Sequence, residues 1–202
     1  MGVDVGPDWR RDLGEVLIDE ASLRARVTEL AERIRTDYVG REPLLVGVLT
    51  GAFVFLADLV RQLDMPLAIG FIRAASYGDR AHSRGQVQVG DDHGVPVGGR
   101  HVILVEDIVD TGHTLARLVA TLQDHKPASL AICCLLDKLG RREVPVTVHY
   151  RGFAVPDEFV VGYGLDFAGR YRHLPYVATL RAEAYQGAVE QTSKGCDDAG
   201  VG

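Results

Sequence analysis

Two adjacent acids followed by a loop rich in hydroxyls are the residues of this sequence best suited to chemistry. Glu106 and Asp107 come directly after the apolar run 102–105, and the loop Asp110–Thr114 follows before a segment of helical spacing. If the apolar run is a strand of a parallel sheet, the acids lie at its carboxyl end, where open α/β sheets bind ligands. Backbone N–H groups at the start of the next helix would form a cradle for a phosphate group.

Carboxylates beside such a cradle restrict what the ligand can be. Glu106 and Asp107 would repel a phosphate unless they contact sugar hydroxyls or a divalent cation that the phosphate shares. Acids and threonines before a helix are also ordinary capping residues, so the loop alone allows both interpretations. Phosphate, sugar hydroxyls and metal together indicate a phosphorylated sugar as substrate.

The elements that would position these residues alternate between apolar runs and helical spacing. A chain that alternates in this way is typical of an α/β protein with a parallel sheet. The polar, glycine-bearing stretch 76–94 interrupts the alternation as a long loop. The expected strands are 44–49, 67–75, 101–105 and 130–136, and the expected helices are 22–37, 53–63 (with Phe53, Leu56, Ala57, Val60 and Leu63 on the core side) and 115–125.

The segment Val102–Leu115 resembles the phosphoribosyl pyrophosphate signature of type I phosphoribosyltransferases, most closely that of the hypoxanthine-guanine phosphoribosyltransferases. The similarity extends from about Leu13 to Tyr185. It implies an α/β fold with a central, mainly parallel sheet flanked by helices. We therefore expect a single domain over 14–185, with a core at about 40–160 and a small hood formed by the N-terminal helix and C-terminal segments. Residues 1–13 and 186–202 are expected to be disordered tails.

The same resemblance implies how the sugar and its phosphates are bound. Asp110 is expected to accept a proton near purine N7, so that N9 becomes the nucleophile. The Leu49–Thr50–Gly51 turn resembles a pyrophosphate-binding loop with a non-proline cis peptide, although many relatives carry lysine in place of Thr50. The residues expected to bind phosphoribosyl pyrophosphate are Glu106 and Asp107 (ribose hydroxyls), Asp110, Thr111, Gly112, His113 and Thr114 (5′-phosphate), and Thr50, Gly51 and Arg172 (pyrophosphate).

A second set of residues resembles the purine site. Lys138 is expected to donate to O6 of the base, which would favour 6-oxopurines over adenine. Phe159 would stack on the purine, the backbone of Val160 would meet its edge, and Asp166 would bind Mg²⁺. Without the resemblance, Lys138 is better interpreted as a solvated lysine at a strand end beside two arginines, and 159–161 as a buried strand.

The resemblance also implies a mobile flap, an oligomer and a reaction. Ser76 and Tyr77 would open a flap that closes over the reaction centre and excludes water. Relatives of this kind are commonly homodimers or homotetramers. The reaction would transfer the phosphoribosyl group from phosphoribosyl pyrophosphate to hypoxanthine or guanine, which gives IMP or GMP.

Composition limits the partners and the location. The 28 acidic and 22 basic residues give a net charge of −6, which predicts neither nucleic-acid nor membrane binding. No long apolar stretch or leader-like N-terminus is present, so we expect a cytoplasmic protein with reduced, non-catalytic cysteines at Cys133, Cys134 and Cys196. Two alternatives stay open: a nucleotide- and RNA-binding regulator of the same fold, and an enzyme that prefers xanthine or a pyrimidine.

Overall fold

The structure is a computed structural model that describes residues 9–73 and 95–184 of the 202-residue chain. It divides the chain into two compact units. The larger unit comprises 21–157, and the smaller one combines 1–20 with 158–202. The smaller unit is thus assembled from both ends of the chain, as expected for the hood.

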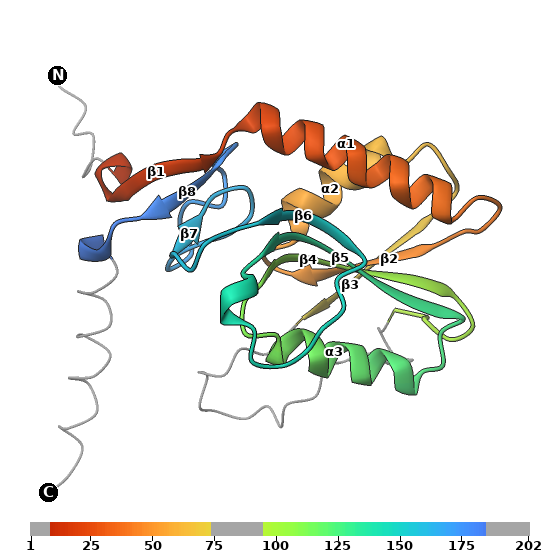
Figure 1. Ribbon diagram of the computed structural model, residues 1–202. Helices are drawn as coiled ribbons and strands as arrows, with labels where there is room; N and C mark the ends of the chain where they lie inside the picture. Colours follow the sequence, from red (N-terminus) through yellow and green to blue (C-terminus); the bar gives the residue numbers. More distant parts are fainter. Residues whose placement is uncertain (1–8, 74–94, 185–202) are drawn as a thin grey trace, which may run out of the picture. The chain divides into compact units, whose positions relative to one another are not determined.

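The larger unit is built on a five-stranded sheet in which every pair of neighbours is parallel. Helices α1 and α2 lie over one face of this sheet and α3 lies over the other (Figure 1). This confirms the expected parallel α/β architecture. In spatial order the strands are β3 (Ala68–Arg73), β2 (Leu44–Leu49), β4 (His101–Val109), β5 (Ser129–Asp137) and β6 (Tyr150–Ala154), and the helices are α1 (Glu20–Asp37), α2 (Phe53–Gln62) and α3 (His113–Asp124).

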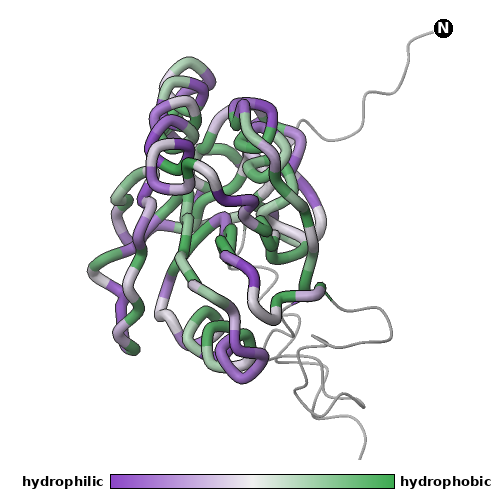
Figure 2. Tube along the Cα trace, turned by 90° about the vertical axis from the view of Figure 1, so that its right-hand side faces the viewer, coloured by the Kyte–Doolittle hydropathy of each residue, from purple (hydrophilic) through white to green (hydrophobic). Residues whose placement is uncertain are grey.

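The core of the larger unit follows from the two periodicities. Alternate residues of the central strands point to one face, and residues three or four apart on α3 pack against them. On the opposite face, Leu56 of α2 approaches so closely that a Cβ on Gly47 would lie 2.7 Å from its Cδ2. Figure 2 shows the helices as coils in which hydrophilic and hydrophobic residues alternate. The cluster on the α3 side includes Leu44, Val46, Val48, Val102, Leu104, Leu115, Leu118, Leu122, Ile132 and Cys134.

The buried face of α2 differs in part from the one expected, since Leu56 and Leu63 are buried as predicted but Phe53 and Ala57 are not. Phe55, Leu56 and Leu59 are the buried residues of this helix, whereas Phe53 is 42% exposed and Ala57 is also exposed. Both stripes have helical spacing, because the sequence here is apolar nearly all round. Leu56, which belongs to both stripes, packs over Gly47 of β2, and the rotation of the helix about this contact buries Phe55 and Leu59.

Strand β4 is longer than the apolar run that predicted it. The expected strand ended at Val105, with the two acids beyond it, but β4 continues to Val109. The parallel ladder with β5 continues through Glu106, Ile108 and Val109, so tertiary pairing carries the strand past the acids. Glu106 and Asp107 consequently lie within the carboxyl-terminal half of β4, and Asp110 is the first residue beyond the strand.

The smaller unit is a three-stranded antiparallel sheet in the order β1 (Leu13–Ile18), β8 (Val177–Leu180), β7 (Val160–Val161). Its first element is the 3-10 helix η1 (Trp9–Asp12), where we expected a disordered tail. The Trp9 ring packs on Tyr171 and His173, and Asp12 accepts hydrogen bonds from Tyr171 and Arg181. These contacts explain why residues 9–12 form an ordered helical turn.

Helix α1 also differs from the expectation, because it belongs with the larger unit and not with the hood. Its apolar stripe is buried at Leu23, Val27, Leu30 and Ile34. The guanidinium of Arg33 lies over the Tyr150 ring of β6, which ties the helix to that side of the sheet. The strand β1, and not the helix, is therefore the N-terminal part of the smaller unit.

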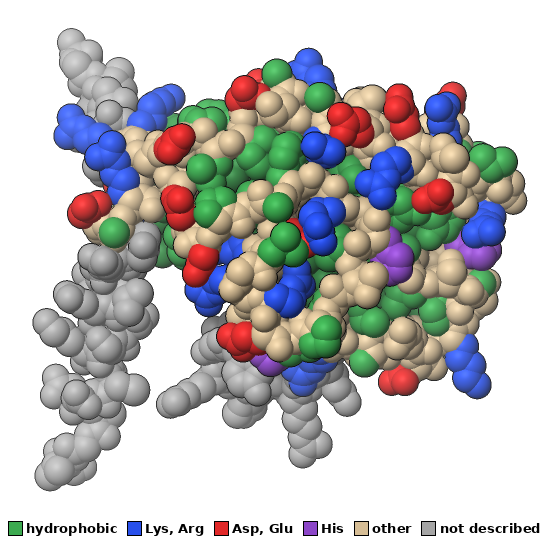
Figure 3. All heavy atoms as spheres, in the orientation of Figure 1, with side chains coloured by type: hydrophobic (Ala, Val, Ile, Leu, Met, Phe, Trp, Pro, Cys, Tyr) green, Lys and Arg blue, Asp and Glu red, His purple; other side chains and the backbone are tan. Residues whose placement is uncertain are grey.

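Some expectations concern residues outside the described ranges, namely the flap residues Ser76 and Tyr77, Cys196 and the tail 186–202. Within 9–73 and 95–184 no helix has the length and apolarity to span a membrane. Figure 3 shows acidic and basic side chains interspersed over the face in view. Cys133 and Cys134 are buried free thiols, and burial raises the pKa of both.

Candidate active site

The acids of β4 lie in a buried environment at the carboxyl end of the sheet. Glu106 is desolvated, which raises its pKa well above the ordinary value, and the neighbouring charge of Asp107 raises it further. Its Oε2 is buried and accepts no hydrogen bond from the described residues. Asp107 is 8% exposed, and its Oδ1 accepts a hydrogen bond from the N–H of Ile108 at 2.8 Å. An acidic pair with acceptor capacity to spare is suited to bind hydroxyls or a hard cation.

The turn after β2 packs directly against this pair. The peptide between Leu49 and Thr50 is cis, as expected for this turn. A Cβ on Gly51 would lie 1.7 Å from Oδ2 of Asp107, so only glycine allows the turn to come this close. The structure therefore brings the predicted pyrophosphate loop and the predicted ribose acids together.

The loop Asp110–Thr114 turns from β4 into α3. Gly112 has φ +93° and immediately precedes α3, whose first residues have no side-chain cap from it. Glycine adopts this left-handed backbone conformation at low energetic cost. The first N–H groups of α3 have no intrahelical partners, and the positive end of the helix dipole lies here. This geometry is that of the predicted anion cradle.

Lys138 is buried, which contradicts its interpretation as a solvated lysine. It follows β5, its N–H donates to the carbonyl of Val109 at 2.9 Å, and the residue is only 7% exposed. Its Nζ lies 3.6 Å from Oδ1 of Asp157. The backbone bond to Val109 places Lys138 next to the start of the loop that Asp110 begins, so two predicted functional residues from neighbouring strands are brought together.

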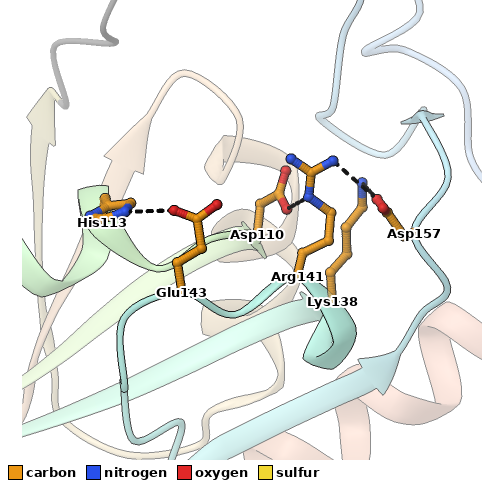
Figure 4. A network of polar contacts seen from close by, with 6 residues as sticks. All are labelled: Asp110, His113, Lys138, Arg141, Glu143 and Asp157. Atoms are coloured by element: carbon orange, nitrogen blue, oxygen red, sulfur yellow. Dashed lines mark hydrogen bonds and ion pairs between the residues drawn. The ribbon is translucent and has the colours of Figure 1, made fainter.

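A network of charges surrounds these two residues (Figure 4). Arg141 Nε lies 3.0 Å from Asp110 Oδ1, and Arg141 Nη1 lies 3.4 Å from Asp157 Oδ1. Although the Asp110–Arg141 distance is that of an ion pair, the buried Asp110 Oδ1 accepts no hydrogen bond from any described residue. The Asp110 side chain as a whole is 44% exposed, so a ligand can reach its carboxylate group.

Three charged residues beside the loop were not predicted as functional. Asp137, the last residue of β5, is fully buried and pairs with Arg142 and Arg151. In the sequence, Arg142 is one of the two arginines beside Lys138. An acid that ends a long apolar strand was the available signal, because a buried carboxylate requires charged partners.

The smaller unit holds four more of the predicted residues. Phe159 is 40% exposed and meets the Phe167 ring edge-on at a centroid distance of 5.5 Å. Val160 is buried in β7 and pairs with Thr179. Arg172 lies 2.6 Å from Oδ1 of Asp166 and donates to the carbonyl of Gly164. The smaller unit thus offers a partly exposed aromatic ring, a strand edge and an acid–arginine pair.

The described residues include no group of three or more His, Cys, Asp or Glu side chains that could hold a metal ion by themselves. Mg²⁺ is usually bound by one or two carboxylates together with substrate phosphates, so this donor set suits it better than a metal that needs a complete protein cage. The buried and unpartnered oxygen of Glu106 fits such a hard cation. Asp166 already accepts from Arg172 and from the N–H of Gly169, which leaves only its remaining lone pairs for a ligand.

Comparison with known proteins gives one consistent result. Residues 15–168 match the family model described as the phosphoribosyl transferase domain. The chain is 48% identical over 168 residues to the hypoxanthine phosphoribosyltransferase of Salmonella typhimurium, covering 82% of this chain and 94% of that protein. Two crystal structures are similar: a hypoxanthine-guanine phosphoribosyltransferase from Bacillus anthracis (44% identity, TM-score 0.75, 84% of this chain and 99% of that one) and a hypoxanthine phosphoribosyltransferase from Staphylococcus aureus (40% identity, TM-score 0.80, 90% and 99%).

Proposed function

Because the chain belongs to the phosphoribosyl transferase domain family, we propose that it transfers the phosphoribosyl group of phosphoribosyl pyrophosphate to N9 of hypoxanthine or guanine. The products are IMP or GMP and pyrophosphate, so the reaction is one of purine salvage. Similarity to enzymes named hypoxanthine phosphoribosyltransferase over more than nine-tenths of their length supports the base as well as the reaction.

One observation carries the proposal: Gly112, the glycine of the anion cradle, lies two residues after Asp110, and the buried Lys138 is hydrogen-bonded to the residue before Asp110. A ligand phosphate at the start of α3 would thus lie next to a proton acceptor and a buried cation. The proposed substrates present the complementary groups: a 5′-phosphate on phosphoribosyl pyrophosphate, and a ring nitrogen that loses a proton and a 6-oxo group on the base.

The residues of the larger unit have the following proposed roles. Glu106 and Asp107 bind the ribose hydroxyls, and Thr111 to Thr114 bind the 5′-phosphate through backbone N–H and hydroxyl groups. Asp110 accepts a proton from the purine as N9 bonds to the anomeric carbon and pyrophosphate departs. Lys138 donates a hydrogen bond to O6 of the base, and a 6-amino group cannot accept such a bond.

The residues of the smaller unit are proposed to bind the base and the leaving group. Phe159 stacks on the purine, and the backbone of Val160 meets the base edge. Arg172 binds pyrophosphate, because a planar guanidinium can hold two phosphate oxygens at once. Mg²⁺, when bound, would neutralise part of the pyrophosphate charge, and Asp166 would hold it directly or through water.

The proposal is tested by Mg²⁺-dependent nucleotide formation from phosphoribosyl pyrophosphate, with hypoxanthine, guanine, xanthine, adenine and uracil offered separately. Turnover with hypoxanthine or guanine and not with adenine or uracil is expected. Preference for xanthine or uracil would assign a different base. Tight binding of phosphoribosyl pyrophosphate without turnover on any base would favour a regulatory protein instead.

Two further features belong to the proposal. A homodimer or homotetramer is the expected assembly, and sedimentation of the purified chain measures it directly. A cytoplasmic location also stays a prediction.

A further inference from the structure

Three charged residues form a cluster around one buried carboxylate behind the anion cradle. Asp137 is fully buried, and each of its carboxylate oxygens has one cationic partner. Oδ1 contacts Nη2 of Arg142, and Oδ2 lies 2.7 Å from Nε of Arg151. One carboxylate and two guanidinium groups leave the cluster with a net charge of +1. The side chain of Arg142 is 16% exposed, whereas that of Arg151 is 44% exposed, so Arg142 carries the buried part of this charge.

Arg142 is held directly against the loop Asp110–Thr114. The carbonyl of Thr111 accepts hydrogen bonds from the N–H groups of Glu143 and Val144, at 3.0 and 3.1 Å. These two bonds fix the segment that follows Arg142 to the loop. A Cβ on Gly112 would lie 3.2 Å from Cδ and 3.4 Å from Nη1 of Arg142, so the guanidinium lies beside the glycine of the cradle.

The charge of Arg142 is only partly compensated in this position. Its Nη1 is buried and donates to no acceptor among the described residues. The other acids of the loop region have different partners, because Glu143 pairs with His113 and Asp110 lies next to Arg141 (Figure 4). The N-terminus of α3 adds a further partial positive charge. Like charges buried together are unfavourable, and an anion in the cradle would remove this cost.

We propose that Arg142 is a positioning residue for the phosphate end of the substrate, and that Asp137 holds it in place. This inference rests on the proposed function, in which the loop binds a 5′-phosphate. Arg142 acts through the loop: it supports the backbone at Gly112 and supplies a positive potential from behind the N–H groups. Arg151 has a different part, because it neutralises and anchors Asp137 from β6.

The test compares two ligands that differ only in the phosphate, IMP and inosine, by titration calorimetry on the full chain. Arg142→Met should weaken IMP binding about tenfold, because a partly buried positive charge beside the phosphate site is lost. Inosine affinity should stay within about twofold of that of the unmodified protein. Arg142→Lys should recover most of the IMP affinity, since it restores the charge.

A matched control and a second variant keep the result interpretable. Arg151→Met removes the other partner of Asp137 and should leave the ratio of IMP to inosine affinity unchanged. Arg142→Gln removes the charge but keeps a hydrogen-bond donor for Asp137, so it replaces Arg142→Met if that variant does not fold. Equal weakening of IMP and inosine, an unchanged IMP affinity, or equal ratios in the variants of Arg142 and Arg151 would each overturn the inference. Failure of the unmodified chain to bind IMP would instead refute the proposed function, and it requires no variant to detect.

Discussion

Replacing Gly51 with alanine tests the contact between the turn after β2 and the acids of β4. The new Cβ would lie 1.7 Å from Oδ2 and 2.5 Å from Cγ of Asp107. Real Cβ atoms essentially never approach closer than 3.0 Å, so the carboxylate or the turn must move by about 1.3 Å, the difference between these distances. Asp107 is 8% exposed, which leaves it little room to move. Overpacking of this kind costs about 1–3 kcal/mol.

Both stability and catalysis should report this displacement. For a domain of this size the cost corresponds to a fall of about 2–12 °C in melting temperature. A shift of about 1 Å in a substrate-binding group can reduce the rate about a hundredfold, so kcat/KM for phosphoribosyl pyrophosphate should fall by about that factor. Steady-state kinetics at saturating hypoxanthine and thermal melting measure the two effects.

The matched control for this change is Gly140→Ala. A Cβ at Gly140 would meet no atom within 4 Å, and this glycine has no positive φ. The control should therefore keep the melting temperature and the KM for phosphoribosyl pyrophosphate. If Gly51→Ala behaved like Gly140→Ala in both assays, the packing of the turn against Asp107 would be refuted.

Three more predictions concern the acids and the lysine. Asp110→Ala should lower kcat far more than it weakens binding of phosphoribosyl pyrophosphate, whereas Glu106→Ala combined with Asp107→Ala should mainly weaken binding; an unchanged kcat in the Asp110 variant would rule out its role as proton acceptor. Burial raises the pKa of Glu106 above its ordinary 4.5, so the folded state favours the neutral acid. The contribution of Glu106 to folding stability is therefore fully present below about pH 4.5 and is lost as the pH rises through the raised pKa. Glu106→Gln, which cannot ionise, should therefore melt at increasingly higher temperature than the unmodified protein as the pH rises from 4 to 9, and a difference independent of pH would contradict this. Lys138→Met should reduce kcat/KM for hypoxanthine by at least about a hundredfold, because the hydrogen-bond donor to O6 is lost. The ratio of kcat/KM for hypoxanthine to that for adenine should therefore fall, and an unchanged ratio would show that Lys138 does not bind O6.

The order of elements and the position of the cradle could be predicted from the sequence. Apolar runs at 44–49, 101–105 and 130–136 appear as β2, β4 and β5, and the loop Asp110–Thr114 leads into α3. These features depend on local preferences, namely buried strands that are apolar throughout and a glycine before a helix. Asp110 and Lys138 could be located because each follows a strand and because the motifs resemble those of a known family.

Other features could not be predicted, because they depend on contacts between residues far apart in the sequence. The extension of β4 to Val109 depends on its ladder with β5, and the burial of Phe55 and Leu59 on α2 depends on how the helix packs on the sheet. The order of 9–12 depends on contacts between Trp9 and the ring of Tyr171.

The charged cluster shows the same division between sequence and tertiary structure. The sequence by itself determined which acids and bases are available, and that Asp137 and Lys138 end an apolar strand. Only the tertiary structure decided which of the nearby charges is buried with which partner, since β5, β6 and the segment after Lys138 must first come together. The cost of burying a charge depends on the surrounding atoms, and local sequence does not specify those atoms. The contact of Gly51 with Asp107 and the place of Arg142 behind the cradle are therefore properties of the fold.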